Sequence, residues 1–177
     1  MGSRVGIAIC LILGFSGCSS LDFYGQAFGG QWRILRDRVP IEDVLQALDQ
    51  TEETKSKLRL VQEIRIFADQ SIGMSVGEQY TSYVELQRPY VVWNVFAAER
   101  GSVQGEHWCY PIVGCAPYRG YFDGDDARRF AASLEADGFE TYVAGVPAYS
   151  TLGWFDDPVL STFLDWPEAD LAGLLFH

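Results

Sequence analysis

An apolar stripe with the period of an α-helix marks the first half of the chain. We expect one long helix over about Glu52–Ser71, capped by Thr51 and ended by Gly73. Its apolar side chains, which we expect in the core, are Leu58, Val61, Ile64, Phe67 and Ala68. A shorter helix is expected over Ile41–Asp49, because the fixed φ of Pro40 suits the first helical turn.

The middle of the chain changes to short runs rich in Val, Tyr and Phe, residues that favour β-strands. Tyr80–Leu86 and Tyr90–Ala97 are separated by Arg88–Pro89, and we expect them to form two strands of one sheet. Further strands are expected around Tyr110–Val113, over Tyr118–Phe122 and over Phe139–Gly145, with a helix over Asp125–Asp137 that Gly138 closes. A helix between two strands predicts a crossover within a mixed sheet, and therefore an α+β domain.

The last residues of the chain predict the start of another helix. Asp165 is expected as its N-cap, with Pro167 in the first turn. One apolar face contains Leu171, Leu174 and Leu175. The sequence stops at His177, about three turns into this helix and without a Gly or Pro to end it, so we expect a truncated chain.

An irregular run dense in aromatic and hydroxyl side chains separates the last strand from this helix, from Pro147 to Trp166. Loops of this kind often line binding sites. Four of its residues are candidate substrate contacts: Tyr149, Ser150, Thr151 and Trp154. Asp156 and Asp157 have two interpretations, a carboxylate pair for chemistry or the turn before Pro158, and Asp-Asp-Pro favours the turn.

The composition indicates one folded, acidic domain. The chain has 177 residues, and 48% of them are hydrophobic, which is enough to build a core. Its formal net charge is -11 at pH 7. Because such a surface repels phosphate backbones, we expect no nucleic-acid partner.

The first residues have the parts of a secretory leader. Arg4 precedes an apolar run over Val5–Phe15, and small residues follow up to Cys18. This run is far shorter than the roughly 20 apolar residues that cross a bilayer, so we expect residues 1–17 to be cleaved as a lipoprotein signal peptide. Small residues directly before a cysteine resemble a lipobox, which predicts acylation of Cys18. An ordinary signal peptide with an incidental cysteine is the alternative.

Acylation would make residues 18–39 a lipidated tether that leads into the first helix. The tether is predicted from Gly25, Gly29 and Gly30 among aromatic residues, with only part of Gln26–Arg36 helical. We therefore expect an exported lipoprotein that is anchored in a membrane and faces the periplasm.

Export changes how the two remaining cysteines are interpreted, because disulfides persist in oxidising compartments. Cys109 and Cys115 lie six residues apart, and Pro111 and Gly114 allow the turn that brings them together, so we expect a disulfide. The alternative is a cysteine hydrolase, in which Cys109 is a nucleophile activated by nearby His107.

Several blocks of sequence, spread over nearly all of the chain after the leader, carry a resemblance to a known family. They are Tyr24-Gly25-Gln26-Ala27 with Gly30-Gln31, Val61–Arg65 with Phe67-Ala68, Arg88–Ala97, Trp108-Cys109 with Gly114-Cys115, Tyr118–Phe122, and Val146–Pro158. Together they are similar to the predicted zinc aminopeptidase family of Gram-negative lipoproteins. In that family the position of His177 is followed by Glu-Leu-Ala-His, which completes a His-Glu-x-x-His zinc motif.

The resemblance implies a zinc enzyme that removes N-terminal residues from peptides in the cell envelope. His177 would be the first zinc ligand, on the start of a zincin-type active-site helix, and residues 40–177 the N-terminal part of a metallopeptidase-like domain. The motif also needs a glutamate as base and a second histidine. His107 falls on no motif position. We therefore expect zinc in the full-length parent, and expect this chain alone to bind none and to be inactive.

A different class of function is also compatible with the sequence. A non-enzymatic envelope lipoprotein could bind a ligand or partner through the aromatic loop at Tyr149–Phe155, and it would need no metal. A full-length protein that holds no zinc after gentle purification would favour this binding protein over the peptidase.

Overall fold

The computed structural model describes residues 18–110 and 114–176, and for residues 18–21 it describes the backbone alone. The predicted leader and the candidate zinc ligand His177 therefore lie outside the described residues, as does most of the strand predicted around Tyr110–Val113.

The first element is a long helix, α2 (Cys18–Asp37), where the glycines had suggested a tether. The helix predicted for part of Gln26–Arg36 is therefore confirmed, and it extends over the residues that were expected to be an irregular tether. Gly30 explains the difference, because a Cβ at this position would lie 2.1 Å from Cγ of Phe122. The glycine permits close packing of helix on core, which a sequence pattern cannot distinguish from a glycine that confers flexibility.

Two further helices follow as predicted, with changed ends. α3 (Ile41–Gln46) is shorter than expected, and α4 (Glu52–Phe67) continues into a π-helical turn, η1 (Ala68–Ile72). The Thr51 cap is confirmed, since its Oγ1 accepts a hydrogen bond from the Thr54 N–H at 3.1 Å. Gly73 ends η1 with a φ of 75°, also as predicted.

The apolar stripe of α4 is only partly in the core. Leu58 and Val61 are fully buried and Ala68 nearly so, which confirms the prediction for these positions. Phe67 is 53% exposed, so its predicted core position is wrong. It follows Leu58 by nine residues, which is two and a half turns at 3.6 residues per turn, so its side chain lies on the opposite face of α4.

Among the described residues the strands form two three-stranded sheets and the two-stranded pair β4 (Trp108–Tyr110) and β5 (Gly114–Ala116). The first has the order β1 (Val39–Pro40), β2 (Ser82–Val84) and β8 (Val159–Leu160), with β2 antiparallel to β1 and parallel to β8. The second has the order β6 (Arg119–Tyr121), β3 (Val92–Glu99) and β7 (Phe139–Val146), all antiparallel to their neighbours.

The predicted crossover is present in the second sheet. The helix α5 (Gly124–Ala136) joins β6 to β7, which run in the same direction on either side of β3. The mixed sheet is the other one, and the prediction that Tyr80–Leu86 and Tyr90–Ala97 share a sheet is wrong. Between them the Arg88 side chain donates to the carbonyls of Val91 and Phe122, which holds the chain as it leaves one sheet for the other.

The C-terminal part is a short helix, α6 (Ser161–Leu164), and then α7 (Glu168–Leu175). Pro167 is the N-cap of α7, and Asp165 instead ends α6, so the predicted Asp165 cap is wrong. Because Asp165 is taken up by the end of α6, the next helix starts two residues later, with Pro167 as its N-cap. Leu171 is fully buried, which confirms the apolar face of α7.

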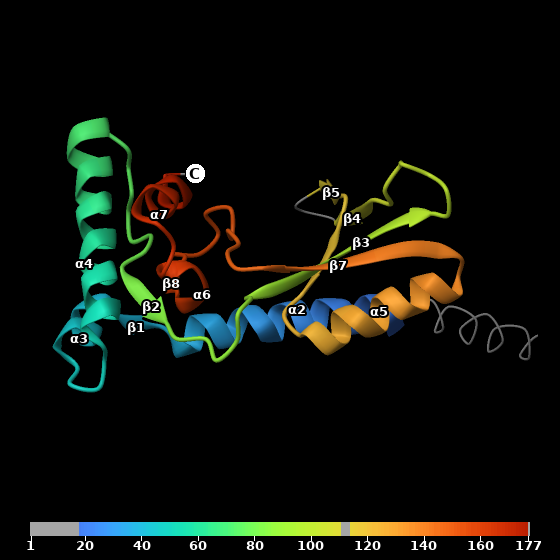
Figure 1. Ribbon diagram of the computed structural model, residues 1–177, viewed down its shortest axis with the longest axis horizontal. Coiled ribbons are helices and arrows are strands. Elements are labelled where there is room, and N and C mark those ends of the chain that lie inside the picture. The colour runs from blue at the N-terminus through green and yellow to red at the C-terminus, as the bar shows by residue number, and fades with distance from the viewer. Residues whose placement is uncertain (1–17, 111–113, 177) are drawn as a thin grey trace, which may run out of the picture.

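Figure 1 shows two groups of elements connected by α2. On the left, α4 stands beside α7 and the first sheet, and on the right α5 lies along β3 and β7. Ile34 of α2 belongs to the core of the first group, and Phe23 packs against that of the second. The predicted α+β class is confirmed.

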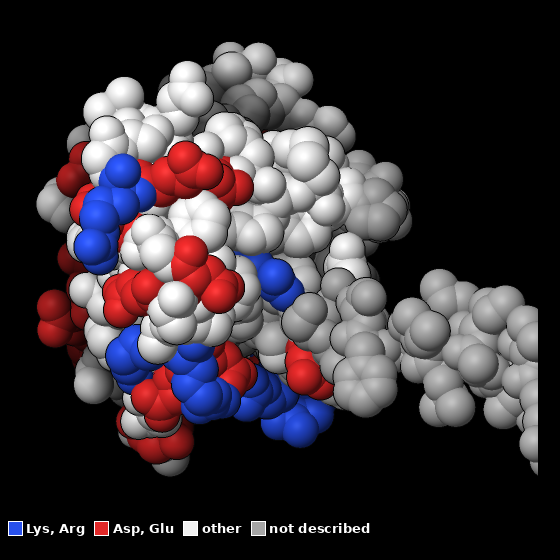
Figure 2. All heavy atoms as spheres, turned by 90° about the vertical axis from the view of Figure 1, so that its right-hand side faces the viewer, with Lys and Arg blue, Asp and Glu red and all other residues white. Residues whose placement is uncertain are grey.

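The surface of the second group carries charges of both signs. On the face seen in Figure 2, acidic and basic side chains lie close together and no large area of one sign is visible. Arg128 and Arg129 of α5, for example, pair with Asp125 and Asp126 one turn earlier.

Candidate substrate pocket beside helix α7

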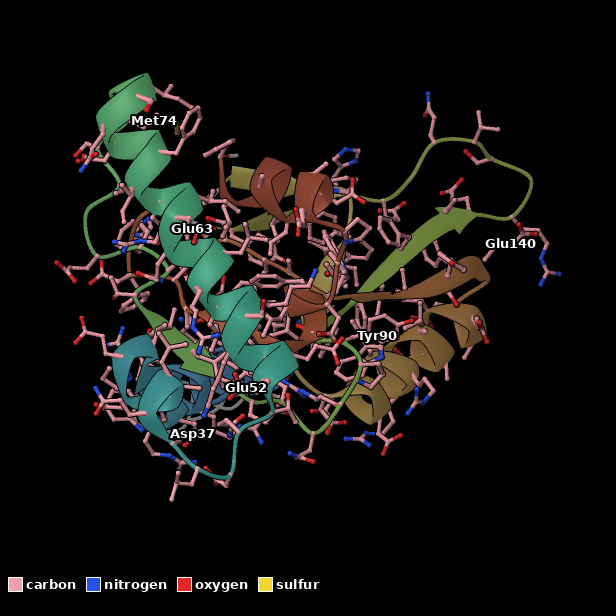
Figure 3. All side chains as sticks on the ribbon, turned by 60° about the vertical axis from the view of Figure 1, so that its left-hand side comes forward. Asp37, Glu52, Glu63, Met74, Tyr90 and Glu140 are labelled. Atoms are coloured by element: carbon pink, nitrogen blue, oxygen red, sulfur yellow. A yellow bond between two sulfur atoms is a disulfide. The ribbon has the colours of Figure 1, made fainter. Side chains whose placement is uncertain are left out.

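A pocket of about 270 Å³ lies between the end of α4, η1, the following loop and the end of α7. Figure 3 shows α4 from Glu52 at one end to Met74 beyond the other, and Met74 is one wall of the pocket. Its apolar lining consists of Ile64, Ala68, Met74, Val76, Leu175 and Phe176. The pocket therefore has an apolar interior, to which α4 and α7 both contribute.

Side chains of α4 hold the loop that forms one edge of the pocket. Arg65 donates from Nε to the carbonyl of Gln79 at 2.6 Å and from Nη2 to the carbonyl of Gly77 at 2.9 Å. Gln62 donates from Nε2 to the carbonyl of Tyr80 at 3.1 Å. Tyr80 has a φ of 59°, a backbone conformation that non-glycine residues adopt at a cost. These hydrogen bonds offset that cost.

The loop at residues 77–80 in turn holds the aromatic loop at Tyr149–Phe155. The side-chain amide of Gln79 donates to the carbonyl of Phe155 at 3.0 Å and accepts from the N–H of Asp157 at 2.7 Å. The N–H of Tyr80 donates to the carbonyl of Asp157 at 2.8 Å. Two segments separated by more than seventy residues are thereby joined by both side chain and backbone.

Asp157 anchors the turn in which the candidate substrate contacts lie. Its side chain accepts hydrogen bonds from the Thr151 N–H at 3.0 Å, from Thr151 Oγ1 at 2.6 Å and from Ser150 Oγ at 3.3 Å. The residue is only 7% exposed. The turn therefore lies at Thr151–Trp154, earlier than the predicted position at Asp-Asp-Pro, and Asp157 holds it from outside. The carbonyl of Asp156 accepts from Arg38 at 3.4 Å.

The four candidate substrate contacts have different surroundings. Ser150 lines the pocket, and Thr151 holds Asp157. Tyr149 is directed to the other side of the loop, where its hydroxyl donates to Oε1 of Gln31. Trp154 is exposed and lines no described part of the pocket. A role in substrate binding stays a prediction for all four.

A second hollow lies on the far side of this loop. It has a volume of about 480 Å³ and is lined by residues of α2, β3, β6 and the loop, among them Gln31, Asn94 and Tyr149. Ser150 lines both hollows. The aromatic loop therefore forms the partition between them.

Burial and the charge of Asp157 act on two tyrosines of this region. Burial raises the pKa of Tyr80, and the nearby carboxylate of Asp157 raises it further. The pKa of Tyr149 is raised in the same way, first by burial and then by Asp157, while its hydrogen bond with Gln31 acts in the opposite direction. Both phenols therefore stay protonated at neutral pH and serve as hydrogen-bond donors rather than as bases.

The two cysteines form the predicted disulfide. Cys109 of β4 (Trp108–Tyr110) lies opposite Cys115 of β5 (Gly114–Ala116), and their sulfurs are bonded. The cysteine-hydrolase alternative is therefore wrong, because the bridge leaves Cys109 without a thiol. The Nδ1 atom of His107 lies 3.1 Å from the carbonyl oxygen of Gly105.

The described residues do not supply a zinc site. Within residues 18–110 and 114–176, no group of three or more His, Cys, Asp or Glu side chains could hold a metal ion. The one carboxylate that lines the pocket, Asp157, already accepts three hydrogen bonds. The resemblance assigns the first ligand to His177, outside the described residues, so no catalytic step through zinc is derived from this geometry.

Sequence reasoning missed the residues that build the edge of the pocket. Gln62 and Arg65 lie on one face of α4, directly beside the buried positions Leu58 and Val61. Two polar side chains with long reach next to a core stripe are a signal for contacts with a neighbouring segment. The identity of that segment, around Gln79, has no local signal.

Comparison with known proteins gives one match. The model of a family described as "Putative aminopeptidase" matches residues 22–177. No curated protein and no solved structure matches the chain.

Proposed function

Because the chain belongs to the family described as putative aminopeptidases, we propose that it binds the N-terminal residue of a peptide in the pocket beside α7. The observation that carries this proposal is the position of Leu175 and Phe176. Both line the pocket, and they directly precede His177, which the resemblance assigns to zinc binding. Consecutive Cα atoms are about 3.8 Å apart, so a ligand in the pocket lies close to any chemistry at position 177.

The size and lining of the pocket favour one apolar side chain as the ligand group. Its volume of about 270 Å³ is slightly below the roughly 300 to 1,000 Å³ of pockets that hold whole drug-sized ligands. Burial of apolar surface against its aliphatic and aromatic walls contributes about 25 cal/mol for each Å² removed from water. We therefore expect peptides that begin with Leu, Met or Phe to bind better than those that begin with Gly or Asp.

The hydrogen-bond network supports a preformed pocket. The blocks Val61–Arg65 and Val146–Pro158, which carry much of the resemblance, meet through Gln79 although they are far apart in sequence. A pocket whose edge is fixed before binding loses less conformational entropy when a ligand enters. A low entropy cost favours the binding of a small group, which has little surface to bury.

Zinc in the full-length parent, with His177 as its first ligand, remains part of the proposal on the resemblance alone. The described residues complete no ligand set. Equilibrium dialysis tests this part: we expect clearly less than one tightly bound zinc ion per chain for the 177-residue protein. One ion per chain that persists in His177→Ala would contradict the proposed ligand.

We further propose that the protein is exported and anchored through Cys18. The Cys109–Cys115 disulfide supports an oxidising compartment, because such bonds are rare in reducing ones. Metabolic labelling with radioactive palmitate tests the anchor: the native protein should carry the label and Cys18→Ser should not. Label that persists in Cys18→Ser would argue against acylation at Cys18.

The binding proposal is tested with a pair of substitutions at neighbouring positions. Met74 lines the pocket and is partly exposed, so Met74→Trp should narrow the pocket without burying a misfit in the core. Ile72 lies two residues earlier, is half exposed and does not line the pocket, which makes Ile72→Trp the matched control.

Binding of L-leucinamide, measured by calorimetry, should weaken at least about tenfold in Met74→Trp and stay unchanged in Ile72→Trp. Glycinamide should bind the native chain more weakly than leucinamide. Equal effects of the two substitutions, or no measurable binding of leucinamide, would refute the assignment of this pocket.

One observation favours a second candidate, a non-enzymatic protein that binds a partner through the aromatic loop. Leu152, Trp154 and Phe155 are all exposed at its tip, which is an unusual concentration of large apolar side chains in solvent. Under this alternative, Trp154→Ser would abolish partner binding while Met74→Trp would not.

A further inference from the structure

The exposed side of α2 carries a stripe of large aromatic side chains. Tyr24, Phe28 and Trp32 are spaced four residues apart and therefore lie above one another on one face of the helix. They are 46%, 72% and 57% exposed. The rings of Phe28 and Trp32 stack with centroids 6.4 Å apart. We call these three residues the aromatic stripe.

The opposite side of α2 is fixed to the rest of the fold. Gln26 donates to the carbonyl of Gly120 and accepts from the N–H of Phe122. Gly30 packs directly on the Phe122 ring, and Ile34 is buried in the first core. Because these contacts set the rotation of the helix, the aromatic stripe cannot turn inward, and it stays in solvent unless something covers it.

Basic residues follow the stripe toward the end of the helix. Arg33, Arg36 and Arg38 are exposed, and with Asp22 and Asp37 they give residues 22–38 a net charge of +1 (three Arg minus two Asp). Arg36 pairs with Asp37, and Arg38 donates to the carbonyl of Asp156, which leaves Arg33 to face solvent. The whole chain has a net charge of -11. This segment is therefore locally basic in an acidic protein, and its charge suits an anionic surface.

The place where α2 begins indicates which surface that is. The helix starts at Cys18, the predicted acylation site, and Tyr24 follows six residues later. At about 1.5 Å of rise per residue, the stripe begins roughly 9 Å from the anchor point. No helix among the described residues is long and apolar enough to cross a membrane.

We propose that α2 lies in the plane of a lipid bilayer, with the aromatic stripe in the headgroup region and the exposed Arg33 against anionic headgroups. Tyr and Trp are enriched at this depth of a membrane, because one end of each side chain is apolar and the other is polar. A helix with an apolar stripe beside basic residues is the usual form of an interfacial helix. The inference takes its membrane from the proposed anchor at Cys18 and is independent of the peptidase proposal.

The surface is tested without the lipid, so that the two proposals can fail separately. The chain from residue 18 onward contains all described residues, and Cys18→Ser removes the acylation site. Its binding to vesicles of phosphatidylethanolamine and phosphatidylglycerol is measured by cosedimentation, with phosphatidylcholine vesicles for comparison. We expect binding to the anionic vesicles, weakened on phosphatidylcholine and by added salt.

Substitution of the stripe gives the decisive comparison. Phe28→Ser with Trp32→Ser should reduce vesicle binding at least about tenfold, because the apolar area that enters the membrane is lost. The matched control is Tyr142→Ser on β7, which removes an aromatic side chain of similar exposure elsewhere. Phe28→Leu with Trp32→Phe keeps an apolar stripe and should retain most of the binding, which separates loss of apolar area from misfolding.

Each other outcome overturns the inference. Absence of vesicle binding by the native sequence, or binding that the serine pair leaves unchanged, would exclude the stripe as a membrane surface. Concentration-dependent dimers that the serine pair dissociates, without vesicle binding, would assign the stripe to a second copy of the chain. Failure of the palmitate-labelling test of Cys18→Ser would refute the anchor alone.

Discussion

Two neighbouring glycines of α2 should respond to the same substitution with opposite signs. Gly29→Ala places a methyl group in open space, because no heavy atom lies within 4 Å of its Cβ position. Gly30→Ala places that group 2.1 Å from Cγ of Phe122. Both substitutions make the same chemical change one residue apart in one helix, so the difference between them measures the tertiary contact.

The magnitudes follow from helix propensity and from packing. Alanine is favoured over glycine inside a helix by about 0.8 to 1 kcal/mol, and we expect Gly29→Ala to stabilise the protein by up to this amount. Gly30→Ala has the same gain, but it overpacks the core, which typically costs about 1 to 3 kcal/mol. Relief by movement of Phe122 is restricted, because its N–H is bonded to Gln26 and its ring packs edge-on against Tyr149. The overpacking cost should therefore fall in the upper part of this range, about 2 to 3 kcal/mol, which leaves a net destabilisation of about 1 to 2 kcal/mol.

Urea unfolding monitored by circular dichroism measures both effects. The midpoint should rise in Gly29→Ala and fall in Gly30→Ala, with the slope of the transition unchanged if the unfolded states are alike. Equal or greater stability of Gly30→Ala relative to the native chain would show that α2 does not pack on Phe122 at this distance. That result would also remove the Gly30–Phe122 contact from the evidence that α2 is rotated with its aromatic stripe toward solvent.

Three further substitutions test the loop, a helix cap and the hairpin. Asp157→Asn should lower the free energy of unfolding by about 1 to 3 kcal/mol, because an amide presents a donor where the carboxylate accepts three hydrogen bonds. The control, Asp156→Asn, changes an exposed residue and should have little effect in the same urea titration. Asp123→Ala should cost about 1 kcal/mol, because the Asp123 carboxylate caps α5 through two backbone N–H groups. These same hydrogen bonds lower the pKa of Asp123, so the stability that they provide is present above the ordinary aspartate pKa and is lost as the pH falls through the lowered one. The native and Asp123→Ala proteins should therefore converge in stability in strong acid, and an unchanged difference there would contradict the cap. Replacement of Cys109 and Cys115 by Ser should lower the free energy of unfolding by about 2 kcal/mol, the loop entropy for so short a ring, and should make stability insensitive to reductant.

Local signals predicted the helices best. The cap at Thr51 and the stop at Gly73 depend on residues within a few positions of each helix end, and both are confirmed. The sequence pattern could not reveal the π-helical turn after Phe67, because an extra residue per turn leaves no mark on the order of apolar residues. The exposed Phe67 has a different cause, because the ordinary helical period already places it on the face of α4 opposite Leu58.

The errors concern residues whose role depends on a distant partner. Gly30 resembled a tether glycine because Phe122, the ring that requires it, is over ninety residues away. The two segments around Arg88–Pro89 resembled two strands of one sheet because the hydrogen bond from Arg88 to the distant Phe122 carbonyl has no local signature. Periodicity gives the face that a segment buries, but not the segment that covers it.

The candidate site was predicted in the same partial way. The dense aromatic and hydroxyl residues at Tyr149–Phe155 indicated the loop, and Ser150 does line the pocket. The turn predicted at Asp-Asp-Pro lies instead at Thr151–Trp154, because the Asp157 carboxylate reaches back to the N–H and hydroxyl of Thr151. Gln79 was not identified, since its amide matters only after folding brings the 79–80 and 155–157 backbones together.

The two proposed surfaces are linked through the aromatic loop. Its start is held by α2, because Tyr149 donates to Gln31 on the buried side of that helix. Its end is held by α4, through Arg65 and Gln79. The helix α2, which we propose lies on a membrane, and the aromatic loop, which borders the pocket, are therefore connected by hydrogen bonds. If α2 is fixed by the bilayer, the pocket has a fixed position relative to that bilayer, and peptides in the surrounding compartment meet it in one orientation.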